Sequence, residues 1–543
     1  MHASLSRRRR GHEEPAKVDG PPKALTRVEL AVAVIATLTS MALHGVFIQH
    51  SPALWRDEVN SLKTASAAWP DLWRLMEFES FPPLWDVALG GWLAVGGGAS
   101  DTTLRIGGAI GGLMLLGSVW FAVGRLGRAV PLVSLSLLAV NPEVIRWGAS
   151  LRPWSLGAAF GVVMIVLTYH AAIGRSWRVS AAAMLIGLIA VQTIYQNAIL
   201  LTVAIVCAVA PLVWQRQWGR ATVPIGIGAI CLASLLPYAG IIARRADWDG
   251  LSETPITVAE LGGKLWEVLT ASGQIVAVVW CLLPIAAVVL MVISTSHRSL
   301  RGYACSVVVL GVAALMGFYL LFRYPTQRWY YLPLAVLVAV AFEIAIAIDR
   351  GARHVRFARV GLALIVLLAG TGPAITALRV PQTTMNVIAG LVDRHAESGD
   401  LIVVSPWYYA VSFTHYYRGG LETMTIPPLA DVSVHRYDLL KKAMCQVDVM
   451  RPVRERIQQV LSSGHRIWLV GALAAPAPGE ATRPPAPPPL PRTRWNSSPY
   501  EEAWILEIGE FLTKHTKAGG MIPLPMPAGS LEVPTLAVMQ GWR

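Results

Sequence analysis

Two adjacent carboxylates, Asp57 and Glu58, follow the first long apolar segment of the chain. A membrane helix that begins near residue 29 would emerge into water at this point. Ionisable side chains at that depth are costly and therefore indicate a functional site, although acids are also expected at a plain solvated helix end. A carboxylate in this position can serve as a general base. A third acid, Glu79, follows in the same predicted loop, residues 49–103.

Four arginines are predicted to lie on the same face of the membrane as these acids. They are Arg152, Arg328, Arg323 and Arg244. Any one of them alone is expected as an anchor beside the aromatic belt of a membrane interface. Gathered beside carboxylates, they favour a phosphate-binding surface, because the guanidinium fork matches phosphate oxygens in a bidentate way. Four aromatic residues near these charges are candidate substrate contacts: Trp55, Trp154, Tyr195 and Tyr330.

The composition is that of an integral membrane protein. The chain has 543 residues, of which 54% are hydrophobic and 15% charged, and its mean hydropathy is +0.51. The net charge of +13 does not indicate nucleic-acid binding, because the basic residues fall in short clusters between apolar runs. Four of the five cysteines lie in apolar runs and Cys445 stands apart, so cysteine usage does not fix the redox compartment.

The apolar runs predict an all-α polytopic bundle of about eleven spans. They cover approximately 29–48, 104–124, 130–145, 155–173, 179–194, 198–214, 221–242, 273–294, 304–322, 330–348 and 360–378. The apolar segment 84–97 is shorter than a span and is predicted to stay at the outer surface.

This assignment places twelve arginines on the cytoplasmic side, as the positive-inside rule expects. They are Arg125, Arg128, Arg175, Arg178, Arg216, Arg220, Arg298, Arg301, Arg350, Arg353, Arg356 and Arg359. The protein is therefore predicted to lie in the plasma (inner) membrane with a cytoplasmic N-terminus and an extracytoplasmic C-terminus.

Three regions follow from these patterns. Residues 1–28 are predicted to be a basic, disordered cytoplasmic tail rather than a cleaved signal peptide. Residues 29–378 form the predicted membrane module. Residues 379–543 have the composition of a soluble domain and are predicted to form a small extracytoplasmic α/β domain. A Pro-rich insert, residues 475–492, interrupts that domain.

Local patterns predict further elements. Asp400–Ser405 and Arg466–Gly471 are expected as strands of a small parallel sheet, with a helix over Arg454–Ser462 between them. No dinucleotide-binding fingerprint accompanies these strands. In the outer loop from about 243 to 272, apolar side chains at helical spacing predict an amphipathic helix on the membrane, although a plain connector fits equally well.

The order of these motifs resembles that of the GT-C glycosyltransferases, in particular the bacterial protein-mannosyltransferase-like, aminoarabinose-transferase-like and Rgt-type enzymes. The resemblance covers about residues 29–380. The acidic pair, Glu79 before Pro82-Pro83-Leu84, the Arg152-Pro153-Trp154 element and the Arg328-Trp329-Tyr330-Tyr331 element match the family pattern in order. Phe81 stands where many members have histidine, and Trp154 stands where they have tyrosine.

The resemblance implies transfer of a sugar from a polyprenyl-phosphate donor in the membrane lipid to an acceptor glycan, lipid or protein on the outer face. Asp57 is then the expected general base, and Glu58 orients or shares it. The four arginines are expected to bind the leaving phosphate, with Arg152 and Arg328 first. Direct displacement would invert the anomeric carbon, whereas a retaining path would need Glu79 as nucleophile. No cofactor is required, but paired acids also hold divalent cations, so the use of a metal stays open.

Two other functions compete with glycosyl transfer. A transporter or flippase for a lipid-linked sugar would line a path with charged groups inside its spans, whereas the charges of interest here gather at one face. A non-catalytic membrane partner with a GT-C-like fold would tolerate the departures at Phe81 and Trp154.

Overall fold

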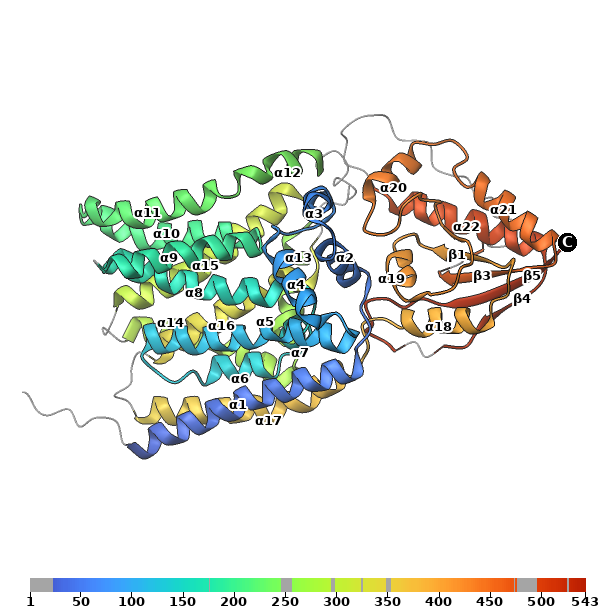
Figure 1. Cartoon of the computed structure of the whole chain (residues 1–543). Coiled ribbons are helices and arrows are strands. Elements are labelled where there is room, and N and C mark those ends of the chain that lie inside the picture. Colours follow the sequence, from blue (N-terminus) through green and yellow to red (C-terminus); the bar gives the residue numbers. More distant parts are fainter. Residues whose placement is uncertain are drawn as a thin grey trace, which may run out of the picture.

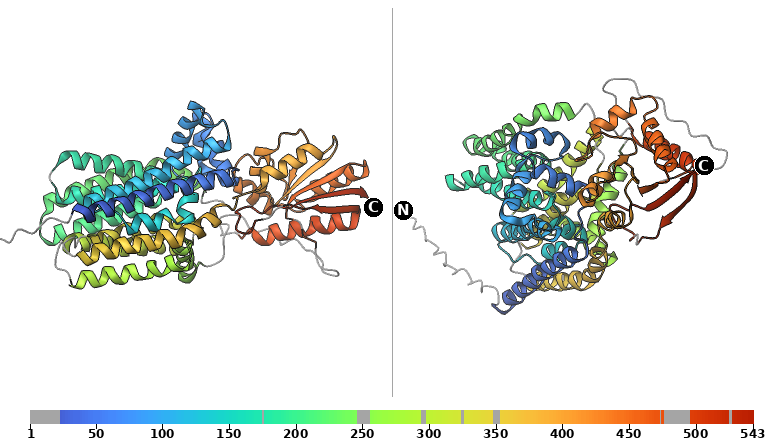
Figure 2. Two further views of the ribbon diagram at one scale, coloured as in Figure 1. Left: turned by 90° about the horizontal axis from the view of Figure 1, so that it is seen from below. Right: turned by 45° about the vertical axis from the view of Figure 1, so that its right-hand side comes forward.

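A helical bundle with an α/β unit attached to one end makes up the computed structural model of the chain (Figures 1 and 2). It describes residues 23–174, 176–245, 256–293, 298–323, 326–347, 353–472, 474–475, 496–524 and 527–543. Most of the predicted basic tail and most of the Pro-rich insert 475–492 lie outside these residues, as do Arg175 and Arg350.

Helices occupy every predicted apolar run. The bundle contains α1 Lys23–His50, α5 Asp101–Ala122, α6 Val133–Ala139, α7 Pro142–Gly148, α8 Trp154–Ile173, α9 Trp177–Thr193, α10 Gln196–Trp214, α11 Trp218–Ala233, α14 Gln274–Ile293, α15 Arg298–Phe322, α16 Leu332–Ala347 and α17 Arg353–Leu378. Within the described residues, eight helices are long and apolar enough to span a membrane. A ninth counts if α13 Val258–Thr270 and α14, bent by 114°, form one span.

The polytopic bundle is confirmed, while the count of eleven spans stays a prediction for three segments, one of which is α14 with its bent neighbour α13. Helix α9 is apolar but has only 17 residues. The run 130–145 is broken into α6 and α7 because Asn141 caps α7 through the N–H groups of Glu143 and Val144, and Pro142 begins the new helix.

The links predicted to be cytoplasmic gather at the end of the bundle away from the α/β unit (Figure 1). The segment that continues α5, η3 Val123–Gly127, reaches α16, where Gly127 lies against Ala347. The starts of α1 and α17 are joined by Arg356, whose Nε donates to Glu29 Oε1 at 3.0 Å. Exposed tryptophans at this end, Trp177, Trp214 and Trp218, are typical of a membrane–water interface. The orientation of this end in the membrane stays a prediction.

The opposite end carries the short helices that surround the acidic pair (Figure 1). They are α2 Arg56–Ala65, α3 Trp69–Leu75, η1 Met76–Phe78, α4 Leu84–Trp92, η2 Leu93–Gly97, η4 Leu236–Tyr238, α12 Ala239–Arg245, α13 and η5 Arg328–Tyr331. The apolar segment 84–97 is thus one short helix with an irregular end. The helix predicted in the loop 243–272 is α13, which buries Leu261 and Val268 against the protein.

The C-terminal unit contains a mixed sheet of five strands in the order β2-β1-β3-β5-β4. The strands are β1 Leu401–Ser405, β2 Thr423–Thr425, β3 Arg466–Gly471, β4 Thr516–Ile522 and β5 Leu536–Trp542. The helices are α18 Met385–His395, α19 Tyr409–Tyr416, α20 Tyr437–Met444, α21 Arg451–Ser462 and α22 Ser498–His515.

The two predicted strands are present as β1 and β3, and they pair in parallel. The sheet also contains strands that were not predicted, and it is not parallel throughout, because β5 runs antiparallel to both β3 and β4. Strand β1 is buried along its whole length, with Leu401 and Val403 in one apolar cluster and Ile402 and Val404 in another. Burial on both faces explains why its sequence is a continuous apolar run.

Helix α2 is held to the bundle by a fully buried ion pair between Glu58 and Arg105 of α5. Arg105 Nη1 and Nη2 donate to Glu58 Oε1 and Oε2, both at 2.9 Å. Glu58 Oε1 also accepts from Ser150 Oγ at 2.8 Å and from the Leu151 N–H at 3.1 Å. Arg105 Nη2 donates further to Gln382 Oε1 at 2.8 Å. The pair therefore joins α2, α5, the α7–α8 link and the segment that leads into the C-terminal unit.

Replacing Arg105 by methionine is expected to lower the free energy of unfolding by about 3–5 kcal/mol, because Glu58 would be left buried without its cation. Thermal unfolding of the purified protein in detergent measures this loss. Arg74→Met is the matched control, since Arg74 pairs with Asp71 at the surface and its side chain is 76% exposed. That control is expected to cost less than about 1 kcal/mol. Equal, small shifts for the two variants would contradict the anchoring role of the buried pair.

Reporter fusions test the orientation of the bundle. Fusions after Leu126, Ser176, Gln217, Ser299 and His354 are expected to report the cytoplasm, because the links at that end carry the arginine clusters. A fusion after Gly390 should report the opposite side. An extracytoplasmic signal at Leu126 would refute the predicted orientation.

Candidate functional site

Asp57 is the predicted acid that remains open to solvent. It lies in the first turn of α2, where the helix dipole favours a negative charge, and its side chain is 22% exposed. His435 Nε2 lies 3.1 Å from Asp57 Oδ1, and Arg152 Nη2 lies 4.0 Å from Oδ2. Glu58, the next residue, is fully buried in the pair with Arg105. The two adjacent acids therefore have different surroundings.

The charge of Asp57 is stabilised by its neighbours. Burial alone would raise the pKa of this carboxyl, but the hydrogen bond from His435 and the charges of Arg152, His435 and Arg56 together lower it to about 2. Asp57 is thus ionised at neutral pH. Because a carboxylate can only accept, the ring nitrogen Nε2 of His435 carries the hydrogen of their shared bond.

Arg152, in the α7–α8 link, brings Asp57 and Glu79 together. Its Nη1 donates to the Asp57 backbone oxygen at 3.2 Å, to Ser61 Oγ at 2.8 Å and to Glu79 Oε2 at 3.2 Å. The guanidinium also lies over the Phe81 ring, 4.5 Å from its centroid. Phe81, which stands where many GT-C glycosyltransferases have histidine, therefore supports the arginine.

Glu79 is enclosed rather than open. Its Oε1 accepts from Asn60 Nδ2 at 2.6 Å and from Ser61 Oγ at 3.0 Å, and its Oε2 accepts from Arg152. Both Asn60 and Ser61 follow Asp57 on α2. Glu79 thereby links the loop after η1 to α2 and completes the set of hydrogen-bond acceptors around Arg152.

Asp86, on α4, is a buried acid that the sequence patterns did not single out. Burial and then the charge of Glu79 raise the pKa of this carboxyl well above its usual range. Neither of its oxygens has a hydrogen-bond partner among the described residues. Its position inside an apolar segment, directly after Trp85, gave no separate signal.

Three of the four predicted aromatic contacts form one wall next to the acids. Trp55 packs edge-on against Trp329, with ring centroids 5.5 Å apart. Trp154 packs edge-on against Phe81 at 5.0 Å and against Tyr330 at 4.8 Å. The two departures from the family pattern, at Phe81 and Trp154, are therefore in contact with each other, and the η5 segment lies directly against both tryptophans.

Arg328 begins η5 and lies at the edge of this wall. Its side chain is 45% exposed, and its distances of 3.9 Å to Glu143 Oε1 and 3.8 Å to Glu267 Oε2 are long for ion pairs. A further anion can therefore approach its guanidinium from solvent.

The other predicted residues do not contact Asp57 in the described structure. Arg244 pairs with Glu77 at 3.2 Å, on the outer side of η1. Tyr195 packs against Tyr238 in an apolar cluster beside α3. Arg323 is exposed at the end of α15, where it adopts a positive φ of 48°.

The C-terminal unit supplies contacts to α2 that sequence reasoning missed. Glu532 Oε1 accepts from the Arg56 N–H at 3.0 Å. Tyr416 Oη accepts from the Leu54 N–H at 2.6 Å and donates to Asp101 Oδ2 at 2.7 Å. With His435, these side chains surround the start of α2. They are isolated in the sequence and form no motif, so the sequence held no signal that could have found them.

The side chains that could bind a metal ion are not grouped as in a protein metal centre. The described ranges contain no group of three or more histidine, cysteine, aspartate or glutamate side chains arranged to hold a metal ion. The predicted option of a divalent cation stays untested.

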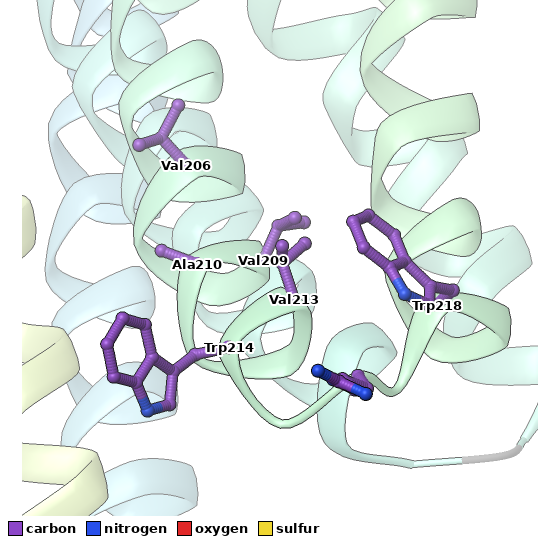
Figure 3. A pocket seen from close by; sticks show the side chains of 7 residues that line it. Val206, Val209, Ala210, Val213, Trp214 and Trp218 are labelled. Atoms are coloured by element: carbon purple, nitrogen blue, oxygen red, sulfur yellow. The ribbon is translucent and has the colours of Figure 1, made fainter.

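A separate pocket of 760 Å³ lies between α10 and α11, at the other end of the bundle (Figure 3). The Trp218 ring faces Val209 and Val213 across the gap. Its lining residues are Val206, Val209, Ala210, Val213, Trp214, Arg216 and Trp218. None of these carries a carboxylate, so the lining offers no base for sugar transfer and suits contact with lipid.

Comparison with known proteins places the fold. No family model matches the sequence, and no curated protein matches it. Among solved structures, the chain is similar to ArnT from Cupriavidus metallidurans, both bound to undecaprenyl phosphate and in the apo state. Each superposition has a TM-score of 0.51 and 11% sequence identity and covers 82% of this chain, with 93% and 92% of ArnT covered respectively. The chain therefore has the fold of ArnT, a polytopic helical bundle, as expected from the resemblance of its motif order to that of the GT-C glycosyltransferases.

Proposed function

We propose that this protein transfers a sugar from a polyprenyl-phosphate donor to an acceptor at the end of the bundle that carries α2. One observation carries the proposal: the open, ionised carboxylate of Asp57 lies 4.0 Å from the guanidinium of Arg152. A proton acceptor and a group that can bind phosphate therefore lie next to each other. The fold shared with ArnT, whose structure holds undecaprenyl phosphate, supports the same class of donor.

Asp57 accepts the proton of the acceptor hydroxyl in this proposal. Its low pKa keeps it in the basic form but makes it a weak base while Arg152 and His435 face it. A donor phosphate that binds Arg152 would offset the arginine's charge. The pKa of Asp57 would then rise, so the carboxylate becomes a stronger base when the donor is in place.

Arg152 and Arg328 bind the leaving phosphate. Arg152 is buried, so its charge acts in a medium of reduced dielectric, where stabilisation of a developing anion is strong. Arg328 approaches from the exposed rim. Of the further candidates, Arg244 and Arg323 lie away from Asp57 and are assigned no role in catalysis.

The remaining predicted acids have structural roles. Glu58 holds α2 through Arg105 and is too enclosed to share the proton transfer. Glu79 holds Arg152 and has partners on both oxygens. A single open carboxylate favours direct displacement, in which the acceptor oxygen attacks as the lipid phosphate leaves, and hence inversion at the anomeric carbon.

Replacing Asp57 by asparagine is expected to lower sugar transfer by roughly 10²–10⁴-fold, because the base is lost while the shape is kept. Membranes containing the variant are assayed with radiolabelled polyprenyl-phosphate sugars. Asp71→Asn on α3 is the control, since that exposed acid pairs only with Arg74 among the described residues and should leave transfer unchanged. Full activity of the Asp57 variant would exclude this residue as the base.

Replacing Arg328 by lysine is expected to weaken donor binding by roughly tenfold, because the fork is lost while the charge remains. Binding of the lipid-phosphate donor to purified protein is the measurement. The corresponding Arg74→Lys change at the surface should leave the affinity as it is. An unaltered affinity for the Arg328 variant would remove this residue from the donor site.

A further inference from the structure

A closed ring of polar contacts runs through the site and includes one residue of the C-terminal unit. His435 Nε2 donates to Asp57 Oδ1 at 3.1 Å, and Asp57 Oδ2 faces Arg152. Arg152 donates to Glu79, and Glu79 accepts from Asn60 Nδ2 at 2.6 Å. Asn60 Oδ1 then accepts from the His435 backbone N–H at 2.8 Å, which closes the ring. Both the side chain and the backbone of His435 are therefore fixed by α2.

The segment that presents His435 is braced on both sides. Arg436 pairs with Asp438, where Nη2 and Oδ2 are 2.8 Å apart, and also with Asp431. The Arg436 guanidinium lies over Phe78, 5.0 Å from the ring centroid, at the end of η1. The imidazole itself stacks on Tyr437, with centroids 5.9 Å apart. These contacts hold the imidazole in one orientation without help from a substrate.

We infer that His435 is a positioning residue for the transfer reaction, so that the C-terminal unit completes the active site of the membrane module. This inference rests on the proposed function. The Nε2–H of His435 donates a hydrogen bond to Asp57 Oδ1. Oδ2 is therefore the oxygen that receives the acceptor's proton. The acceptor oxygen then bonds to the anomeric carbon, and the bond from that carbon to the phosphate oxygen breaks with its electrons on the phosphate.

The position of the second ring nitrogen separates this role from that of a general base. His435 Nδ1 is buried and has no hydrogen-bond partner in the described part of the chain. Because Nε2 carries the hydrogen of its bond to Asp57, this nitrogen has no free lone pair for the acceptor's proton, and Nδ1 is buried away from solvent. Asp57, by contrast, is partly open. The proton therefore goes to the carboxylate, and the imidazole orients it.

Amide substitutions at residue 435 test the inference. The amide nitrogen of glutamine can take the place of Nε2, whereas that of asparagine reaches only the place of Nδ1. His435→Ala and His435→Asn are expected to lower kcat by roughly 10–100-fold, because the base is misplaced, with the donor KM changed less than about twofold. His435→Gln should recover most of kcat, since it restores the N–H to Asp57.

His415→Ala is the matched control. His415 belongs to the same unit and faces a carboxylate of the membrane module, with Nε2 3.9 Å from Asp101 Oδ1, but it lies outside the ring. Its replacement should leave kcat unchanged. Full activity of His435→Ala would overturn the inference. A glutamine variant as inactive as the alanine variant would also overturn it, because the imidazole would then be needed for its own basicity.

A second readout does not depend on activity. Thermal melting of Asp57→Asn, His435→Ala and the double variant forms a double-mutant cycle, and the contact predicts non-additive shifts. Additive shifts would overturn the contact itself. A wild-type protein that transfers no sugar while the shifts are non-additive would instead overturn the proposed function, and with it the catalytic part of this inference.

Discussion

A buried carboxylate–guanidinium pair, Glu58 with Arg105, fixes the helix on which the candidate site is built. Removing two charges from water costs several kcal/mol for each ion, and their attraction offsets this only when further hydrogen bonds satisfy them. Those bonds are present: Ser150 and Leu151 donate to Glu58, and Gln382 accepts from Arg105. Because the pair orients α2, the preceding carboxylate of Asp57 points away from the pair and toward Arg152 and solvent.

The site belongs to neither part of the molecule alone. The membrane module supplies Asp57, Glu79 and Arg152, while the C-terminal unit supplies His435 and Glu532 around the start of α2. The contact between the C-terminal unit and the bundle (Figure 2) therefore also assembles the site. It also distinguishes this end of the molecule from the apolar pocket between α10 and α11, whose lining offers contact area but no acid or base.

The sequence predicted those features that leave a local pattern. Apolar runs predicted the helices, and the motif order predicted that Asp57, Glu79 and Arg152 belong to one site. The sequence could not show that Glu58 is buried whereas Asp57 stays partly exposed. That difference depends on the contact between Glu58 and Arg105, which is 47 residues away in the chain. His435 was invisible for the same reason, since 378 residues separate it from Asp57. The antiparallel edge strand β4 was missed because it contains adjacent glycines, which weaken the strand pattern.

The position of a bound polyprenyl phosphate tests the central claim most directly. A cryo-electron microscopy structure of the full-length protein with this lipid in a nanodisc would locate the phosphate group. The account predicts the phosphate within hydrogen-bond distance of Arg152, beside Asp57 and below the C-terminal unit. A phosphate bound at the opposite end of the bundle, near Arg216 and Trp218, with the surroundings of Asp57 unchanged, would contradict it.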